Sequence, residues 1–160
     1  MNITPEQALE RLMNTCTRYE TSTFKAGQKL QQWKIDNVEQ EKILQQLVRQ
    51  HFIDDARYAR NFVRNKSQRS QWGAQKIRAY LQQQRLSADL IAQALQEIDV
   101  ACEPEVLKKL LNKKWSQTKG KNDADVLAKL TRFGVQKGYK YSLVAEVLRA
   151  LAKERNVDNE

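Results

Sequence analysis

The chain has little of the residues that turns, cross-links and metal sites need. Its 160 residues include only five glycines, two prolines, two cysteines and one histidine. So few glycines and prolines leave little room for the turns of a β-rich fold. The two cysteines, Cys16 and Cys102, are too few for a disulfide framework and are not spaced as metal ligands. No stretch approaches the roughly 20 apolar residues of a membrane helix, so we expect a cytoplasmic protein.

The groups of an active site are missing as well. His51, the only histidine, falls at the end of a predicted helix, where a histidine usually contacts the helix dipole. Asp54 and Asp55 could suggest a metal site or an acid–base pair, but adjacent residues on a helix do not face each other. Capping of free N–H groups at a helix start is the better interpretation. Since a Gly-rich phosphate loop and a nucleophile–base arrangement are also lacking, we expect no enzyme, no cofactor and no metal site.

Helix-forming residues, in contrast, are abundant. Gln, Lys, Arg, Leu and Ala are frequent, and apolar residues make up 41% of the chain. An apolar-periodic helix, a basic helix and a short amphipathic helix recur three times, about every 45–50 residues. Repeats of this kind form arrays of small units that cannot bury their apolar faces alone. The sequence therefore predicts an all-α fold of three tandem three-helix repeats, over residues 5–51, 52–101 and 102–152, in an elongated, curved array.

Local signals place the helix ends and the buried faces. Thr4 before Pro5 predicts the start of the first helix, because a hydroxyl cap precedes a proline whose missing N–H costs nothing there. Gly138 predicts a left-handed helix end in the third repeat. Apolar side chains of the second repeat recur at helical spacing and are expected to form one core. They are Tyr58, Phe62, Leu81, Ile91 and Leu95.

Basic residues exceed acidic ones increasingly along the chain. The formal net charge is +9. Residues 1–50 carry 7 basic and 6 acidic side chains, residues 51–100 carry 8 and 5, and residues 101–160 carry 13 and 8. No acidic residue occurs between Ala56 and Ala88, and a second basic run without acids extends from Lys108 to Lys121. Such clustering is typical of proteins that bind a polyanion, most often nucleic acid.

Basic side chains segregated from the apolar stripes are the candidate binding residues. Three arginines share the polar face of the helix that follows Asp54, and lysines of later helices also point outward. We predict that they contact a partner, and that replacing the three arginines with alanine leaves folding intact. The candidates are Arg57, Arg60, Arg64, Lys76, Lys108, Lys109 and Lys113. The alternative, that these are merely solvated helix faces, stays open.

Several motifs resemble those of the RecX family. The segment from Phe52 to Ala59 reads FIDDARYA, and it is followed by Phe62–Arg64 and by Trp72–Gly73, as in the family's central repeat. Gly138–Tyr139 is similar to the stretch near the end of the family pattern. The resemblance covers roughly residues 8–151 and is most specific in the central block.

Two positions depart from the family pattern. Arg85 stands where a glycine usually follows the middle helix of the second repeat, and Lys34 stands at the corresponding position of the first. These departures concern helix termination more than the family assignment.

The resemblance implies an all-helical modulator of the RecA recombinase without catalytic residues or a cofactor. Such a protein binds along the groove of the RecA–single-stranded-DNA filament, hinders strand exchange, ATP hydrolysis and co-protease activity, and promotes filament disassembly. A second interpretation is a stand-alone helical nucleic-acid-binding protein, because three-helix units are similar to helix-turn-helix domains. Against sequence-specific readout, the basic stripes extend over a long surface and are not concentrated in one recognition helix.

Overall fold

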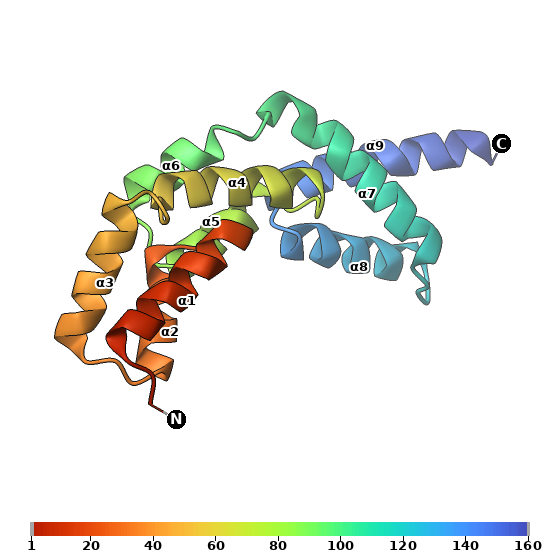
Figure 1. Cartoon of the computed structure of the whole chain (residues 1–160). Coiled ribbons are helices and arrows are strands. Elements are labelled where there is room, and N and C mark those ends of the chain that lie inside the picture. The colour runs from red at the N-terminus through yellow and green to blue at the C-terminus, as the bar shows by residue number, and fades with distance from the viewer. Residues whose placement is uncertain (1, 160) are drawn as a thin grey trace. The chain divides into compact units, whose positions relative to one another are not determined.

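A computed structural model describes residues 2–159 and shows helices throughout this range (Figure 1). No strand occurs in it, so the predicted all-α class is confirmed. The helices are α1 (Pro5–Arg18), α2 (Thr23–Gln32), α3 (Asn37–Arg49), α4 (Asp55–Gln68), α5 (Ala74–Gln83), α6 (Ala88–Leu95), α7 (Glu103–Gln117), α8 (Asp123–Gln136) and α9 (Tyr141–Asp158), with a 3-10 turn, η1 (Val100–Cys102), before α7. None of these helices is both long and apolar enough to span a bilayer.

Short polar side chains begin most of these helices. Thr4 caps α1 in a reciprocal arrangement: its hydroxyl accepts from the Gln7 N–H at 3.2 Å, and the Gln7 side chain accepts from the Thr4 N–H at 3.0 Å. Pro5 stands in the first turn, as predicted. Asp36 accepts from a free N–H group at the start of α3, and Asn122 does so at the start of α8. Each cap satisfies a donor that the helix itself leaves without a partner.

Four helices end in the same left-handed turn, although only one of them has a glycine there. The residues after the caps of α2, α3, α5 and α8 have positive φ: Lys34 (58°), His51 (61°), Arg85 (55°) and Gly138 (102°). In each case the next residue donates its N–H back to the last turn of the helix, for example Ile35 to Leu30 at 3.1 Å. This is the Schellman arrangement. The departures from glycine at two of these positions therefore leave the shape of the helix end unchanged.

Contacts divide the chain into two compact units. Unit 1 comprises Met1–Phe62 and Leu81–Ala94, and unit 2 comprises Val63–Tyr80 and Leu95–Glu160, with Met1 and Glu160 outside the described residues. This division cuts through the second predicted repeat. Repetition in sequence and compactness in contacts are different properties, so the repeat ranges 5–51, 52–101 and 102–152 stay predictions.

The core of unit 1 contains residues of α1, α2 and α3 and of the turns that follow α2 and α3. Leu12, Leu30, Leu47 and Ile53 are almost completely shielded from solvent. Val48, which follows Leu47 on α3, is 46% exposed. Burial of the large aliphatic side chains is the main favourable contribution to this part of the fold, of the order of 2 kcal/mol for each one.

The core of unit 2 lies between α7, α8 and α9. Leu107, Leu111 and Leu130 are fully buried there, together with Val144 from α9. Gly134 allows α8 and α9 to approach closely, because a Cβ at this position would lie 2.8 Å from a methyl group of Val144. The unit therefore has a packed helical core that can hold surface side chains in place.

The predicted core of the second repeat is only partly confirmed. Tyr58, Leu81 and Ile91 are buried, with exposed fractions of 4% or less. Phe62 and Leu95 are half-buried. The Phe62 ring stacks on Tyr58 with their centroids 6.1 Å apart. Truncating Phe62 should therefore cost less than the roughly 3–5 kcal/mol expected for a fully buried phenylalanine.

Candidate functional site

The seven predicted binding residues belong to both units. Arg57 and Arg60 lie on the first half of α4, in unit 1. The other five are in unit 2: Arg64 on α4, Lys76 on α5, and Lys108, Lys109 and Lys113 on α7. Their surroundings differ: the stretches of sequence in which they lie lack acidic residues, but carboxylates from other parts of the chain pair with some of them.

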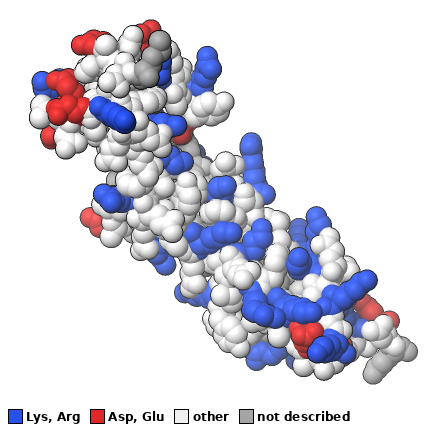
Figure 2. Space-filling model, turned by 90° about the horizontal axis from the view of Figure 1, so that it is seen from below, with Lys and Arg blue, Asp and Glu red and all other residues white. Residues whose placement is uncertain are grey.

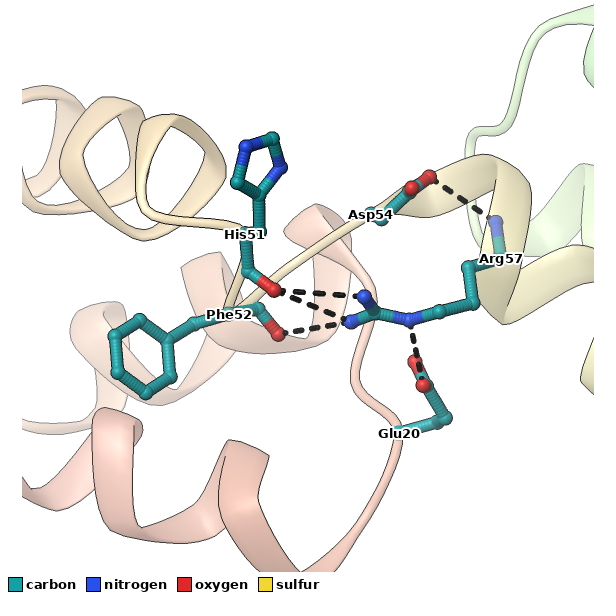
Figure 3. A network of polar contacts seen from close by, with 5 residues as sticks. All are labelled: Glu20, His51, Phe52, Asp54 and Arg57. Atoms are coloured by element: carbon teal, nitrogen blue, oxygen red, sulfur yellow. Dashed lines mark hydrogen bonds and ion pairs between the residues drawn. The ribbon is translucent and has the colours of Figure 1, made fainter.

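Arg57 is committed to contacts inside unit 1 (Figure 3). Its Nε donates to the Glu20 carboxylate at 2.7 Å, and its terminal nitrogens donate to the backbone carbonyls of His51 (3.4 and 3.5 Å) and Phe52 (3.3 Å). Those carbonyls belong to the turn that ends α3. The half-buried Arg57 thus connects the turn after α3 with α4 and with Glu20. The Glu20 carboxylate already pairs with its positive charge.

The two carboxylates before Arg57 are structural caps. Asp54 accepts from the Arg57 N–H at 3.1 Å and so caps α4. Asp55 accepts from the Thr23 N–H at 2.8 Å, which is a donor in the first turn of α2. The capping role predicted for this pair is confirmed, and Asp55 caps a different helix from its own.

Two candidates of unit 2 are paired with acidic side chains on the surface. Arg64 donates to Glu97 at 2.8 Å, and Lys108 donates to Glu154 at 2.8 Å. The hydrogen bond to the carboxylate, helped by the charge of Glu97, raises the pKa of Arg64, and Glu154 raises the pKa of Lys108 in the same way. Exposed ion pairs contribute little stability and are screened by salt, so a phosphate group can replace either carboxylate at low cost.

Four candidates have no acidic neighbour in ion-pair range among residues 2–159: Lys76, which is half-buried, and three others. The three others are Arg60, Lys109 and Lys113, and all three are exposed. Lys109 and Lys113 are one helical turn apart on α7 and so share a face. These side chains present charge to solvent as the sequence predicted.

Lys76 takes part in an aromatic cluster that the sequence did not reveal. Its ammonium group lies 4.2 Å from the centroid of the Trp72 ring, and that of Lys66 lies 4.7 Å from the same centroid. Tyr80 meets Trp72 edge to face, with the centroids 6.4 Å apart. Cation–π attraction holds both ammonium groups over one ring. The four residues lie on two helices and the loop between them, so helical periodicity carries no signal for the cluster.

A second pair of lysines surrounds Phe133. The ammonium groups of Lys114 and Lys137 lie 5.0 and 5.9 Å from the centroid of this ring. Lys137 also donates to the Ser70 carbonyl at 3.4 Å, so it bridges the end of α8 and the α4–α5 loop. Lys114 was visible as part of the second basic run, whereas only the fold places Lys137 near residues 67 positions earlier.

Unit 2 carries nearly all of the excess positive charge. Unit 1 has ten basic and nine acidic side chains, a balance of +1, whereas unit 2 has eighteen and ten, a balance of +8. Figure 2 shows on one face of the molecule how Lys and Arg side chains outnumber those of Asp and Glu. A field of one sign on this scale attracts polyanions before any specific contact forms.

Unit 2 has a hollow of about 350 Å³ beside Trp72. Glu97, Asp99 and Glu103 line it. Burial raises the pKa of Glu103, although Lys140 opposes this shift. The Cys102 thiol donates to Asp99 at 3.1 Å, and this bond raises the pKa of the thiol. A raised pKa favours the protonated thiol, which is a poor nucleophile.

No three His, Cys, Asp or Glu side chains in the described range come together as a metal site would require. Both units present charged and aromatic side chains on the surfaces of their helices. Such surfaces can bind a partner.

Two family models match the chain. One describes the second three-helix domain of RecX and covers residues 54–95, and the other describes the third three-helix domain of RecX and covers residues 102–148. Together they match more than half of the chain.

Curated relatives carry the name regulatory protein RecX. The protein of Streptococcus uberis is 28% identical over 131 residues, which is 81% of this chain and 50% of the relative. That of Clostridium botulinum strain Eklund 17B is 35% identical over 101 residues, 62% of this chain and 47% of the relative. The chain thus spans about half the length of these two proteins. The protein of Mannheimia succiniciproducens is 27% identical over 82% of this chain and 86% of its own length.

Two solved structures share the fold. A crystal structure of regulatory protein RecX has a TM-score of 0.80 at 23% identity and covers 91% of this chain and 71% of its own. The crystal structure of RecX from Lactobacillus salivarius has a TM-score of 0.76 at 18% identity, covering 92% of this chain and 96% of its own. The predicted architecture of three-helix domains agrees with these matches.

Proposed function

Because the chain belongs to the RecX family of regulatory proteins, we propose that it binds RecA–single-stranded-DNA filaments and negatively modulates their recombinase, ATPase and co-protease activities. Its partners would be RecA and the filament, with direct contacts to DNA phosphates, and it needs no cofactor for this role. The observation that carries the proposal is the charge of unit 2, +8 against +1 for unit 1. A nucleoprotein filament presents a continuous polyanion to such a surface.

Within unit 2, two kinds of lysine are best suited to phosphate contacts: those without an ion pair, and those that an aromatic ring already holds in position. Lys109 and Lys113 are exposed and have no ion pair among residues 2–159. Lys66 and Lys76 are positioned over the Trp72 ring. An ammonium group already restrained by a ring loses less conformational freedom on binding than a free lysine does. Arg57, in contrast, acts mainly as a structural residue in this proposal.

The second candidate function is binding of nucleic acid without RecA. It is favoured by the same basic surface, because a net charge of +8 attracts bare DNA as well. The discriminating experiment compares the affinity of the chain for RecA filaments on a single-stranded oligonucleotide with its affinity for the bare oligonucleotide. Tighter binding to filaments at matched salt supports the first function, and equal or weaker binding supports the second.

Inhibition of the RecA ATPase tests the proposed surface. The double variant Lys109→Ala/Lys113→Ala should need a several-fold higher concentration for half inhibition, since each lost phosphate contact weakens binding. The matched control is Arg18→Ala/Lys42→Ala, which removes the same charge from unit 1. If both double variants inhibit equally well, the α7 lysines are only a solvated face.

A further inference from the structure

A groove in unit 1 lies between α1 and α2 and has no part in the surface discussed above. It is a hollow of about 450 Å³. Its walls include Leu12 of α1, Ala26 of α2 and Trp33 at the end of α2. Leu12 and Ala26 are buried, and Trp33 is half-buried against the core of the unit. The apolar floor of the groove is therefore formed mainly by Trp33, which packs against the core that contains Leu12 and Ala26.

Positive and neutral polar groups surround this floor. Lys25 and Lys29 of α2 line the groove, together with hydroxyl and amide side chains such as that of Gln32. None of the described residues that line it is Asp or Glu. The guanidinium group of Arg11 lies 5.8 Å from the centroid of the Trp33 ring. The Lys25 ammonium group lies 5.5 Å from the Tyr58 ring, so it already has an aromatic neighbour.

The charge of this segment stands out from the rest of unit 1. Between Glu20 and Asp36 the chain has three lysines and no acidic residue. The remainder of unit 1 has seven basic and nine acidic side chains, a balance of −2. Positive potential in unit 1 is therefore concentrated along α2.

We infer that the α1–α2 groove binds an acidic peptide segment of a partner protein that carries a large apolar side chain. The apolar side chain of the peptide fills the hollow beside Trp33, and the flanking carboxylates meet Lys29 and the other cations along α2. Apolar anchors seated in a pocket beside a tryptophan, with charges at the rim, are the usual source of affinity in such contacts. The inference does not rest on the proposed function, because it concerns a different surface, and binding there needs neither RecA nor DNA.

A protein segment suits this groove better than nucleic acid does. The affinity for nucleic acid grows with the number of cations that contact phosphates, and unit 2 offers many such cations. This groove, in contrast, offers two lining lysines around an apolar floor. Unit 1 as a whole is nearly neutral, so it does not attract a long polyanion from a distance. A peptide with an apolar side chain between carboxylates can contact both the apolar floor and the lysines at the rim.

Fluorescence anisotropy with the full chain tests the inference. The probe is a fluorescein-labelled twelve-residue peptide in which glutamates alternate with serines around a central leucine–phenylalanine pair. One reference peptide replaces the central pair with serines, and a second replaces the glutamates with glutamines. We expect the probe to bind at least about tenfold more tightly than either reference peptide, since each lacks one of the two contributions.

Charge-reversal variants locate the site. Lys29→Glu, in the groove, should weaken probe binding about tenfold, whereas Lys42→Glu, an exposed lysine of α3 in the same unit, makes the same change in net charge and should have little effect. Trp33→Leu should also weaken binding of the probe, and should reduce the preference for the peptide with the apolar pair, because leucine offers a smaller apolar surface. Melting curves check that each variant is folded, and Lys29→Glu remains decisive if Trp33→Leu is not.

Three results would overturn the inference. Equal loss from Lys29→Glu and Lys42→Glu would mean that only net charge attracts the probe. Equal binding of the probe and the peptide without its apolar pair would mean that the floor is unused. If Lys29→Glu lowers the affinity for labelled oligothymidylate but not for the probe, the groove is a nucleic-acid site.

Discussion

Lys34, His51 and Arg85 hold a backbone conformation that glycine adopts at lower cost. Their φ values of 55–61° lie in the left-handed region, where a Cβ atom crowds the neighbouring carbonyl. The turns persist because the residue that follows each of them is apolar and packs inward: Ile35, Phe52 and Leu86. Packing after the turn offsets a local strain of about 1 kcal/mol.

Lys34→Gly should therefore stabilise the chain by about 0.5–1 kcal/mol, because it relieves the strain at an exposed position without a side-chain contact to lose. Urea denaturation followed by circular dichroism measures this gain. Lys42→Gly, inside α3, is the control and should destabilise by about 1 kcal/mol. A loss of stability in Lys34→Gly would show that the lysine side chain supports the turn.

Arg57 illustrates how a residue predicted to bind a partner can instead stabilise the fold. Arg57→Ala would leave the Glu20 carboxylate and the carbonyls of His51 and Phe52 without their donor. We expect a loss of about 1–2 kcal/mol, as is usual for hydrogen bonds to a charged group at a half-buried site. Arg60→Ala, one turn further along the exposed face of α4, should change the unfolding free energy by less than about 0.5 kcal/mol.

The urea unfolding midpoints of Arg57→Ala and Arg60→Ala measure this difference. Equal midpoints would mean that the Arg57 contacts make no net contribution to stability. The earlier expectation that the Arg57, Arg60 and Arg64 triple variant folds normally is thus revised. If the triple variant inhibits RecA less well, the loss of inhibition would combine a lower stability with a lower affinity.

At the level of elements, two glycines join the α4–α5 loop to the end of α8 within unit 2. The Gly73 N–H donates to the Lys137 carbonyl at 2.7 Å, and the Gln75 N–H donates to the Gly138 carbonyl at 3.0 Å. A Cβ on Gly73 would collide with the Gly138 carbonyl group, which is backbone and cannot move aside. Glycine is needed here for close approach, and at Gly138 also for the positive φ.

Gly73→Ala should destabilise the chain by about 2 kcal/mol or more, because two backbone segments must separate. Gly27→Ala is the matched control: its Cβ would make only an ordinary contact, 3.8 Å from Leu44, inside helix α2. That variant should gain about 0.5–1 kcal/mol from helix propensity. Differential scanning calorimetry should show melting temperatures shifted in opposite directions, and shifts of the same sign would contradict this account.

The Tyr139 hydroxyl crosses the same junction and donates to the Gln71 carbonyl at 2.9 Å. Burial, reinforced by the charge of Glu103, raises the pKa of Tyr139 to about 12 from its ordinary value of 10.0. The folded state then holds this proton more tightly than the unfolded state, so the contribution is complete below pH 10 and is lost as pH rises toward 12.

Tyr139→Phe should accordingly show a smaller fall in melting temperature between pH 10 and pH 12 than the parent chain, although it is less stable at pH 7 because the hydrogen bond is gone. Thermal melts at a series of pH values measure both effects. Parallel curves for the two proteins over this window would show that Tyr139 titrates normally in the fold.

For the whole molecule, the important feature is the uneven division of charge. Unit 2 has a balance of +8 and unit 1 of +1, although the chain is helical throughout residues 2–159. Binding that depends on phosphate contacts should therefore be controlled by unit 2. Salt is the means of testing this, because each contact releases counterions.

The affinity of the parent chain for oligothymidylate should fall linearly on a plot of log affinity against log salt concentration. Lys109→Ala/Lys113→Ala should reduce the slope by about 1.4, that is about 0.7 for each contact to a single strand. Arg18→Ala/Lys42→Ala should leave the slope unchanged. A slope that responds equally to both double variants would assign the DNA contacts to the charge of the whole chain, and not to α7.

The sequence by itself determined the helices and their ends, because these depend on residues only a few positions apart. Thr4 with Gln7, Asp54 with Arg57 and the turn at Gly138 are all local arrangements, and each was predictable. Helical phase likewise predicted that Lys109 and Lys113 are exposed. Three-helix repeats followed from the same periodicity.

Only the tertiary structure decided which charges are free to bind. Glu20 meets Arg57 across 37 positions, Glu97 meets Arg64 across 33, and Glu154 meets Lys108 across 46. No local pattern encodes these pairs, since chain segments distant in sequence come together only when cores pack. For the same reason the lysines around Trp72 and the groove beside Trp33 could not be foreseen. A helix sets the direction of a side chain, but what that side chain meets depends on the packing of the other helices.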